Sequence, residues 1–384
     1  MKQILLKLIL YIAKAGMRFI YFFIKLFTKQ QNNKITMLSR QSNKVNIDFR
    51  LLKEELEKDD YIKLKISCKM IPNSFTKKIG YCFHMISDMY NIATSKVCII
   101  DGYNIPISSL KHKKGLEIIQ VWHAMGAIKK FGYQSLDKEE GSNSKVANIM
   151  NMHANYSLIT CTSKATREFY SEAFNTNKDK IQVLGMPRID YILGKNNEIN
   201  EKSKKILEDF PKLKEKKNII YVPTFRKNEK IDLTDLINNV NEEKYNLIIR
   251  LHPLDENKVD EKYLINKYST MDLLTIADYV ITDYSAIAFE AAILNKPLYF
   301  YLYDIDKYND DRGLNIDLLN EMKSCSKTNI NEIIKLIEKN EYNYNELTNF
   351  RDKYVETMDI HNTDRIVKHI TNIVKKVEKK EKVL

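Results

Sequence analysis

Glycine, proline and cysteine are scarce in this chain of 384 residues, which has ten, seven and five of them respectively. The cysteines are scattered and include no CxxC pair, which predicts reduced thiols in the cytoplasm and argues against a zinc site. No GxGxxG or GxxxxGKS/T loop supports a nicotinamide or P-loop site. HExxH, GxSxG and RRM or KH signatures are also absent. We therefore expect no metal site, no cofactor and no nucleic-acid partner.

Size and charge limit the class of protein. A chain of this length suits two domains of about 150–200 residues each. Its 44% of hydrophobic residues is ordinary for a globular protein. The formal net charge of +12 favours an anionic partner such as lipid headgroups, phosphates or nucleic acid. A lysine-rich soluble surface explains the same charge equally well, so composition alone leaves both interpretations open.

Residues 1–30 are rich in cations and contain no acid. On a helix of 100° per residue, these cations fall within about 60° of one another: Lys7, Lys14, Arg18, Lys25 and Lys29. Ile9, Ile20 and Phe27 lie opposite them. A cation recurs too often for a spanning helix, and a secretory signal would need an uninterrupted apolar stretch. We expect an amphipathic helix on an anionic membrane surface, with a helix packed on the protein's own body as the alternative.

Beyond residue 30, short apolar runs alternate with helical stretches, which predicts an α/β fold with parallel sheets covered on both faces. The lysine-rich stretch 195–217 has no core-facing strand and is the expected linker. Two α/β units of similar size suggest two Rossmann-like domains facing a cleft. The predicted segments are 1–30 for the amphipathic helix, 35–200 and 215–355 for the two domains, and 356–384 for a C-terminal helix with a charged tail.

Polar side chains follow four of the expected strands. Ligands bind at the carboxyl ends of the strands in a doubly wound sheet, so these residues are candidates for phosphate binding or proton transfer. They are His123, Thr224, Arg226, Arg250, His252, Thr282, Asp283 and Ser285. Each of them alone could also be structural, and their agreement carries more weight than any single residue.

Two stretches suit anion binding. In ITDYSAIAFEAAIL a helix is expected to start at about Ser285, where free N–H groups favour a phosphate, although Ser285 or Asp283 could equally be only the N-cap. Arg312-Gly313 could give a bidentate anion contact or form a surface turn. The DxD formed by Asp304 and Asp306 binds a metal in some transferases, but two residues are weak evidence.

Taken together, the motifs make the sequence recognisable. VWHAMGAIKKFGY resembles the Trp-His block of the CDP-glycerol glycerophosphotransferase family, the teichoic-acid primases and polymerases of Gram-positive bacteria. Four later blocks match in order: IIYVPTFRKN, LIIRLHP, ADYVITDYSAIAFEAAILNKPLYFY and YDIDKYNDDRGLNID. The match runs from about residue 40 to residue 370, and five ordered blocks make a specific pattern.

The resemblance implies a GT-B-like architecture and a peripheral enzyme on the cytoplasmic face of the membrane. The first domain would be on the acceptor side and the second would bind the CDP donor. Such an enzyme moves glycerol phosphate, or another polyol phosphate, from CDP-glycerol or CDP-ribitol to a hydroxyl of a lipid-linked or polymer acceptor, releasing CMP. The family's two important histidines match His123 and His252. Its donor-phosphate contacts match Thr282, Asp283, Tyr284 and Ser285, with Arg312 and Gly313 nearby.

The glycines and lysines after His123 suggest how the first block works. Gly126 would let the backbone pass close to a ligand, and Lys129 and Lys130 would attract an anionic acceptor. His123 would take a proton from the attacking hydroxyl, since an imidazole pKa near 6.5 suits a base at neutral pH. His252, Arg312 and the helix start at Ser285 would hold the pyrophosphate. Phosphoryl transfer otherwise depends on positioning and charge neutralisation.

The block after His123 departs from the family, because many members have Gly-Thr-Pro where this chain has Ala124-Met125-Gly126. Ala286 also replaces a common serine. Two other functions stay open at this point. One is a GT-B glycosyltransferase that uses a nucleotide sugar for surface polysaccharide, and the other is a membrane-bound scaffold that keeps the fold without activity.

Overall fold

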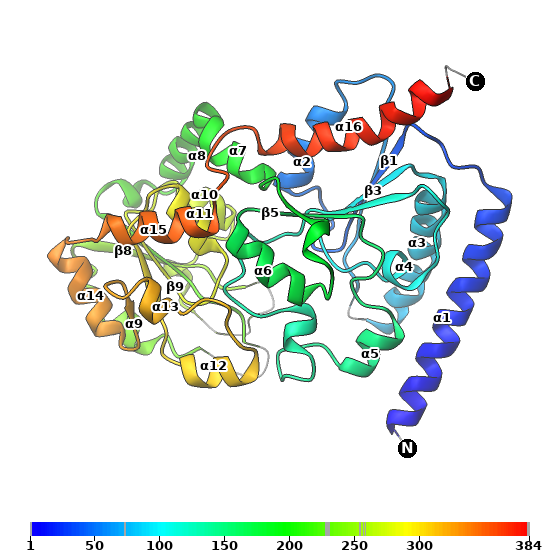
Figure 1. Ribbon diagram of the computed structural model, residues 1–384. Helices are drawn as coiled ribbons and strands as arrows, with labels where there is room; N and C mark the ends of the chain where they lie inside the picture. The colour runs from blue at the N-terminus through cyan, green and yellow to red at the C-terminus, as the bar shows by residue number, and fades with distance from the viewer. Residues whose placement is uncertain are drawn as a thin grey trace. The chain divides into compact units, whose positions relative to one another are not determined.

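The computed structural model describes residues 2–72, 74–226, 231–252, 255, 257 and 259–381. It divides into two α/β units, of which unit 1 is Met1–Ala124, Phe131–Arg188 and His361–Leu384, and unit 2 is Met125–Lys130 and Ile189–Ile360. The predicted pair of α/β domains with parallel sheets is confirmed (Figure 1). The chain changes unit at Arg188, ahead of the linker predicted at 195–217, because α8 (Asn196–Asp209) packs within unit 2. The cleft expected between the domains stays a prediction.

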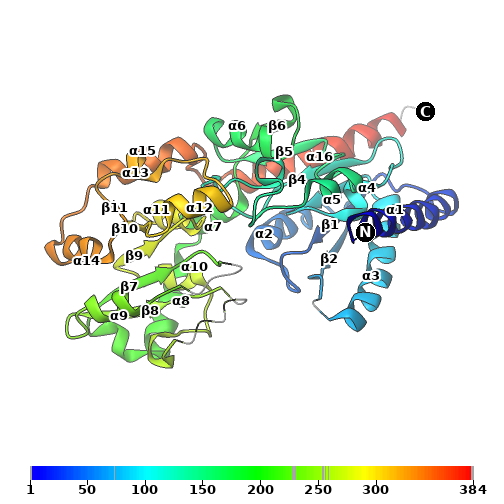
Figure 2. The same cartoon turned by 90° about the horizontal axis from the view of Figure 1, so that it is seen from below.

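Unit 1 has a six-stranded parallel sheet in the order β2-β1-β3-β4-β5-β6, which Figure 2 shows for the labelled strands. The strands are β1 Lys34–Ser39, β2 Lys63–Cys68, β3 Val97–Ile100, β4 Glu117–Gln120, β5 Leu158–Cys161 and β6 Ile181–Val183. The helices are α1 Lys2–Phe27, α2 Ile47–Leu56, α3 Phe75–Thr94, α4 Ile105–Ser109, α5 Ser144–Ile149, α6 Lys164–Ala173 and α16 Asn362–Glu381. Every residue of β1, β3 and β5 is buried, as expected for a parallel sheet covered on both faces.

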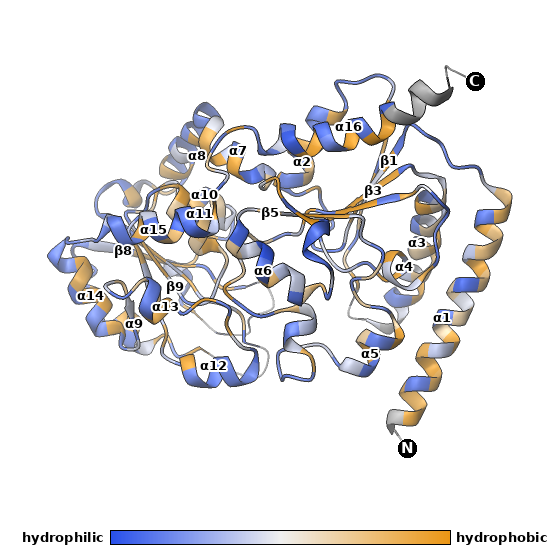
Figure 3. Cartoon of the chain, in the orientation of Figure 1, coloured by the Kyte–Doolittle hydropathy of each residue, from blue (hydrophilic) through white to orange (hydrophobic). Residues whose placement is uncertain are grey.

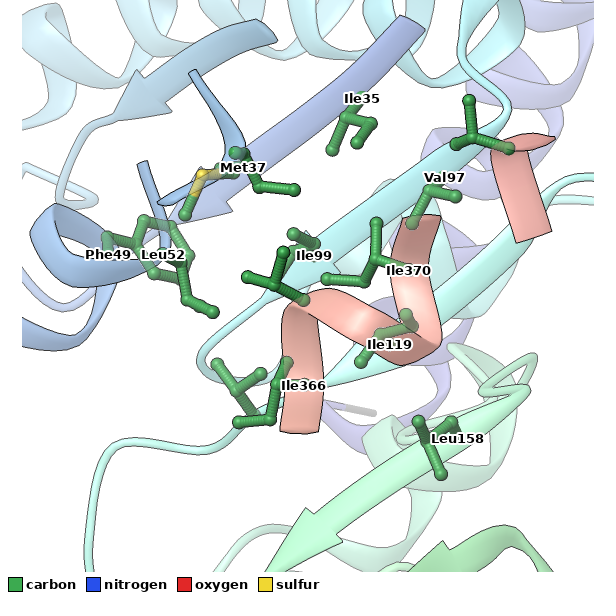
Figure 4. Packing of buried hydrophobic residues seen from close by; sticks show 14 residues of the cluster. Ile35, Met37, Phe49, Leu52, Val97, Ile99, Ile119, Leu158, Ile366 and Ile370 are labelled. Atoms are coloured by element: carbon green, nitrogen blue, oxygen red, sulfur yellow. The ribbon is translucent and has the colours of Figure 1, made fainter. Parts of the chain in front are cut away.

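The core of unit 1 includes the last helix of the chain. Ile366 and Ile370 of α16 lie beside Ile99 and Ile119 of the sheet, and all four side chains are fully buried (Figure 4). Phe49 and other apolar residues of α2 complete this cluster. The segment 356–384, predicted as a separate helix and tail, is therefore largely a core element of unit 1, because its apolar residues recur on one helical face.

Unit 2 has a five-stranded parallel sheet in the order β11-β10-β9-β7-β8 (Figure 2). The strands are β7 Lys217–Val222, β8 Tyr245–Ile249, β9 Tyr279–Thr282, β10 Leu298–Tyr301 and β11 Ser326–Lys327. The helices are α8, α9 Thr234–Asn239, α10 Thr270–Leu274, α11 Ile287–Ile293, α12 Ile305–Asp311, α13 Leu318–Glu321, α14 Ile330–Lys339 and α15 Tyr344–Tyr354, and α7 Pro187–Gly194 joins the units. The carboxyl ends of β7, β8 and β9 lie at one edge, which brings the candidate residues that follow them into one region.

Helix α1 packs on unit 1 through a narrow stripe of its surface. Met17 and Tyr21 are buried, and Lys14 donates a hydrogen bond to a backbone carbonyl at the end of α5. Lys25 Nζ donates to a second carbonyl, in the loop after α4, at 2.7 Å. Two of the five aligned cations thus face the protein, which matches the alternative of a helix packed on the body along this stripe.

Most of the remaining side chains of α1 are exposed, and the hydropathy colouring of Figure 3 shows that many of its residues are apolar. The side chains of Ile9, Ile20 and Phe27, expected opposite the cations, are 53%, 37% and 78% exposed. Among the described residues no helix is both long enough and apolar enough to cross a membrane. The sequence therefore predicted the helix and its apolar face, and the structure adds that this face is not covered by described parts of unit 1.

Candidate functional site

His123 lies just beyond β4 in unit 1, and one edge of its ring is fixed by a backbone carbonyl. Its Nδ1 is 2.8 Å from the backbone oxygen of Asp101. Because that oxygen only accepts, a neutral imidazole carries its proton on Nδ1 and its basic lone pair on Nε2. The geometry thus selects the tautomer in which Nε2 can take a proton.

Trp122 supports this imidazole from a strained backbone conformation. Its φ is +58°, in the left-handed region, which costs a bulky residue about 1–3 kcal/mol. The indole lies between the rings of His123 and Phe131, at centroid distances of 4.2 and 4.7 Å. The Trp122 backbone N–H also donates to Gln120 Oε1 at 2.9 Å. The strain is therefore opposed by aromatic packing and by a hydrogen bond that turns the chain at the end of β4.

The Asp101 side chain is a buried carboxyl group beside the histidine loop. Ser39 Oγ and Asn46 Nδ2 donate to its Oδ2 at 2.7 and 2.8 Å. Burial raises the pKa of Asp101 to about 6, although these two hydrogen bonds oppose the rise. The position was visible in the sequence as the end of an apolar strand, but its contact with His123 was not.

Arg188, at the start of α7, is part of the support for His123. Its guanidinium pairs with the buried carboxylate of Asp48 and also donates to the backbone oxygen of His123 at 3.1 Å. The sequence gave no sign of this pairing, which joins residues far apart along the chain. Arg188 therefore fixes the backbone that carries the imidazole.

In unit 2, three of the predicted donor contacts form a buried network. Arg226 pairs with Asp283 at 3.1 Å and with Asp304 at 2.9 Å, and it is only 6% exposed. Its guanidinium lies over the rings of Tyr308 and Tyr284, 4.5 and 5.3 Å from their centroids. Tyr284 donates to Asp304 at 3.0 Å. These groups are paired and shielded from solvent, which favours a supporting role for Arg226, Asp283 and Tyr284, and their direct contact with the donor stays a prediction.

The two threonines of this region are buried as well. Thr282 Oγ1 donates to the backbone oxygen of Val222 at 2.6 Å, which ties β9 to β7. The Thr224 backbone N–H donates to Asp283 at 2.8 Å. Thr224 Oγ1 is buried and has no hydrogen-bond partner among the described residues. Of the two, Thr224 thus keeps a polar atom that the fold leaves unsatisfied.

Ser285 is only half-buried, unlike Thr282, Asp283 and Tyr284 before it. Helix α11 begins at Ile287 with Ala286 as its N-cap, two residues later than predicted. The N-cap makes no side-chain hydrogen bond, and Ser285 Oγ accepts weakly from the Ile287 N–H at 3.5 Å. Neither Ser285 nor Asp283 is therefore the N-cap, so the N-cap explanation offered for them does not hold.

His252 and Arg250 follow β8 but differ in their surroundings. His252 packs against the Phe225 ring at 5.2 Å, and partial burial lowers its pKa, with the charge of Lys129 lowering it further. Arg250 donates to the backbone oxygen of Ile265 at 3.2 Å and to the side chain of Asn266 at 3.0 Å. The described contacts of Arg250 thus hold the loop that contains Ile265 and Asn266 in place.

The segment Met125–Lys130, predicted to be on the acceptor side, belongs to unit 2. Lys130 N–H donates to the Gly313 oxygen at 2.9 Å, and Arg312 Nε donates to the Lys130 oxygen at 3.0 Å. Gly126 has φ +60°, and a Cβ there would lie 2.1 Å from the Phe289 ring of α11. The backbone pairing and this close approach place the segment in unit 2, whereas the acceptor-side role of Gly126, Lys129 and Lys130 stays a prediction.

Metal binding finds no support in these side chains. Asp304 of the DxD motif is paired with Arg226, and within the described part of the chain no group of three His, Cys, Asp or Glu residues could hold a metal ion.

The sequence of this chain matches a known protein family. The profile described as CDP-Glycerol:Poly(glycerophosphate) glycerophosphotransferase matches residues 20–372. The chain belongs to this family. A teichoic acid glycerol-phosphate primase of Bacillus subtilis is 30% identical, with 92% of this chain and 95% of the primase covered. A teichoic acid ribitol-phosphate primase of Bacillus spizizenii is 28% identical, with 90% and 92% covered.

The fold agrees with solved structures of the wall teichoic acid polymerase TagF. One of them gives a TM-score of 0.73 at 18% identity and covers 97% of this chain and 98% of that chain. A TagF variant soaked with CDPG gives a TM-score of 0.71 at 18% identity, with 97% and 98% covered. At this identity the likeness concerns the fold alone.

Proposed function

We propose that this protein transfers a polyol phosphate from a CDP-activated donor to an acceptor hydroxyl in teichoic-acid synthesis and releases CMP. The observation that carries the proposal is the family match over residues 20–372, which includes His123 and His252. One related primase is named for glycerol phosphate and the other for ribitol phosphate, so CDP-glycerol and CDP-ribitol are the two candidate donors. The proposed acceptor is a lipid-linked or polyol-phosphate hydroxyl.

His123 is the proposed general base. The acceptor oxygen attacks the phosphorus that carries the polyol, and its proton passes to Nε2, the basic nitrogen of the tautomer fixed by the Asp101 carbonyl. The bond from this phosphorus to the bridging oxygen breaks, and its electron pair leaves with CMP. A neutral imidazole suits this step near neutral pH.

The donor diphosphate is proposed to bind at the carboxyl ends of the strands of unit 2. Ser285, Thr224 and His252 follow three neighbouring strands of this sheet, and Arg312 lies on a loop of the same unit. The buried network around Arg226 and Asp283 would hold these loops in place. Charge neutralisation by such groups is the main requirement of phosphoryl transfer.

Turnover of defined donors tests the function. The full chain is incubated with radiolabelled CDP-glycerol, CDP-ribitol and UDP-sugars in the presence of a lipid-linked acceptor, and release of CMP or UDP is scored. We expect CMP release with at least one of the two CDP-polyols. Release of UDP alone would instead support a glycosyltransferase, and no turnover of any donor would support a scaffold.

We also propose that α1 binds the anionic cytoplasmic face of the membrane. Its uncovered apolar face continues onto α3, where Ile79 and Phe83 are 53% and 70% exposed, and these two helices contact each other in unit 1. Lys7 and Arg18 are exposed on α1, and Lys29 is exposed just beyond its end. An apolar face flanked by exposed cations is typical of a helix lying in a membrane interface.

Replacing Phe19, Phe23 and Phe27 by serine should release the protein from anionic vesicles. The variant lacks the apolar area that these exposed rings would bury in lipid, and such burial contributes about 25 cal/mol per Å². Co-sedimentation with phosphatidylglycerol vesicles measures the bound fraction. Exposed Tyr344 of unit 2, changed to serine, is the matched control and should leave binding as in the wild type. Equal binding of the triple variant and the wild type would show that α1 is not the anchor.

A further inference from the structure

The chain segment that follows His123 is held by unit 2 over most of its length. Lys129 forms an isolated antiparallel bridge with Leu314. The Asn315 N–H donates to the Ile128 oxygen at 2.8 Å, next to the bonds that link Lys130 to Gly313 and Arg312. This pairing runs alongside the Arg312-Gly313 block that the sequence had marked for anion binding. The two neighbouring lysines are therefore positioned by the donor-side unit.

The two lysines differ in what their side chains meet. Neighbouring residues of an extended pairing direct their side chains to opposite sides. The stem of Lys130 covers Gly313, where an added Cβ would lie 2.8 Å from Lys130 Cδ. The ammonium of Lys129 lies close enough to His252 for its charge to lower the pKa of that imidazole. Lys129 is thus the lysine that shares a region with the histidine after β8.

This arrangement concentrates positive charge at the edge of the sheet where ligands bind. Asp255 is the carboxylate whose charge acts on His252 in the opposite direction, and burial is the first cause of the lowered pKa. A lysine beside a partly buried histidine is unfavourable for the histidine cation, and an anion between them would remove that repulsion. A diphosphate carries enough negative charge to pair with both groups.

We propose that Lys129 binds the donor diphosphate from within unit 2, together with His252, and does not act on the acceptor. This inference rests on the proposed function for the identity of the donor. His123 and the donor contact Lys129 would then lie on one continuous loop, so the residues that serve the two substrates are close in sequence.

Calorimetric binding to the full chain tests the assignment without turnover. The probes are CDP, UDP and inorganic pyrophosphate, and the variants are Lys129→Met, Lys129→Arg, Lys130→Met and Lys335→Met. Lys335 is exposed on α14 and controls for the loss of one charge in the same unit. We expect Lys129→Met to lower the affinity for CDP and for pyrophosphate about tenfold, as for loss of a charge-assisted hydrogen bond. Lys129→Arg should restore most of this affinity, and Lys335→Met should bind as the wild type does.

A second measurement follows His252 itself in the unliganded protein. Its pKa, measured by NMR titration of the imidazole, should rise in Lys129→Met and should not change in Lys335→Met, since one lowering charge has been removed. Equal affinities in Lys129→Met and Lys335→Met, or a larger loss in Lys130→Met, would overturn the assignment. Binding of UDP in place of CDP with the same dependence on Lys129 would refute the proposed donor and uphold the inference.

Discussion

The His123→Gln variant is expected to lose about 10²–10⁴-fold in kcat/KM, the usual contribution of a general base. Glutamine can still donate a hydrogen bond to the Asp101 carbonyl, so the loop should stay in place while the proton acceptor is lost. CMP release under single-turnover conditions measures the chemical step directly. Because the imidazole would act in its neutral form, the acidic limb of the wild-type pH–rate profile should be absent in the variant.

His361→Gln is the matched control for this experiment. His361 is 64% exposed in its side chain and lies outside both candidate sites, so its replacement should leave kcat/KM within about twofold, as for an ordinary surface substitution. Circular dichroism establishes that both variants are folded. Wild-type turnover in His123→Gln would refute the proposed base, whatever the donor.

Arg226→Met is expected to destabilise unit 2 by about 3–5 kcal/mol, the cost of leaving a buried charge without its partner. Asp283 is fully buried, and the substitution removes its ion pair with Arg226. Asp304 would lose its pair in the same variant. Urea denaturation, followed by the fluorescence of the tyrosine-rich unit 2, measures the change in the free energy of unfolding.

Lys262→Met is the control for the Arg226 prediction. Lys262 pairs with Glu242 on the surface of unit 2, where both side chains are about half exposed. Exposed ion pairs contribute little to stability, so this variant should unfold at nearly the wild-type urea concentration. The contrary outcome is that Arg226→Met also unfolds at the wild-type urea concentration and yet loses donor binding. That result would make Arg226 a direct donor contact, and its supporting role would be wrong.

Much of the fold could be predicted from the sequence because it depends on local patterns. Alternating apolar runs identified both parallel sheets, and polar residues at strand ends identified the positions of His123 and His252. The start of α11 was misplaced by two residues because Asp283 and Ser285 look like good N-caps. In the structure Asp283 instead serves a buried ion pair, a long-range contact that has no local signature.

The same reason explains what the sequence did not reveal about the site. The left-handed conformation of Trp122, the carbonyl of Asp101 behind His123 and the Arg188–Asp48 pair all depend on residues far apart along the chain. Sequence position also suggested that Lys129 belongs to unit 1, whereas its backbone pairing with Leu314 places it in unit 2.

The place of α16 in the core of unit 1 has a consequence for synthesis on the ribosome. Domains generally fold as units, with the N-terminal one first as the chain emerges. Here Ile366, Ile370 and Val374 pack against a sheet whose final strand ends at Val183, so unit 1 lacks part of its interior until the residues after 361 are added. Unit 2, whose strands are all made before residue 361, can reach its full complement of packing partners earlier. The order of completion is then the reverse of the order of translation.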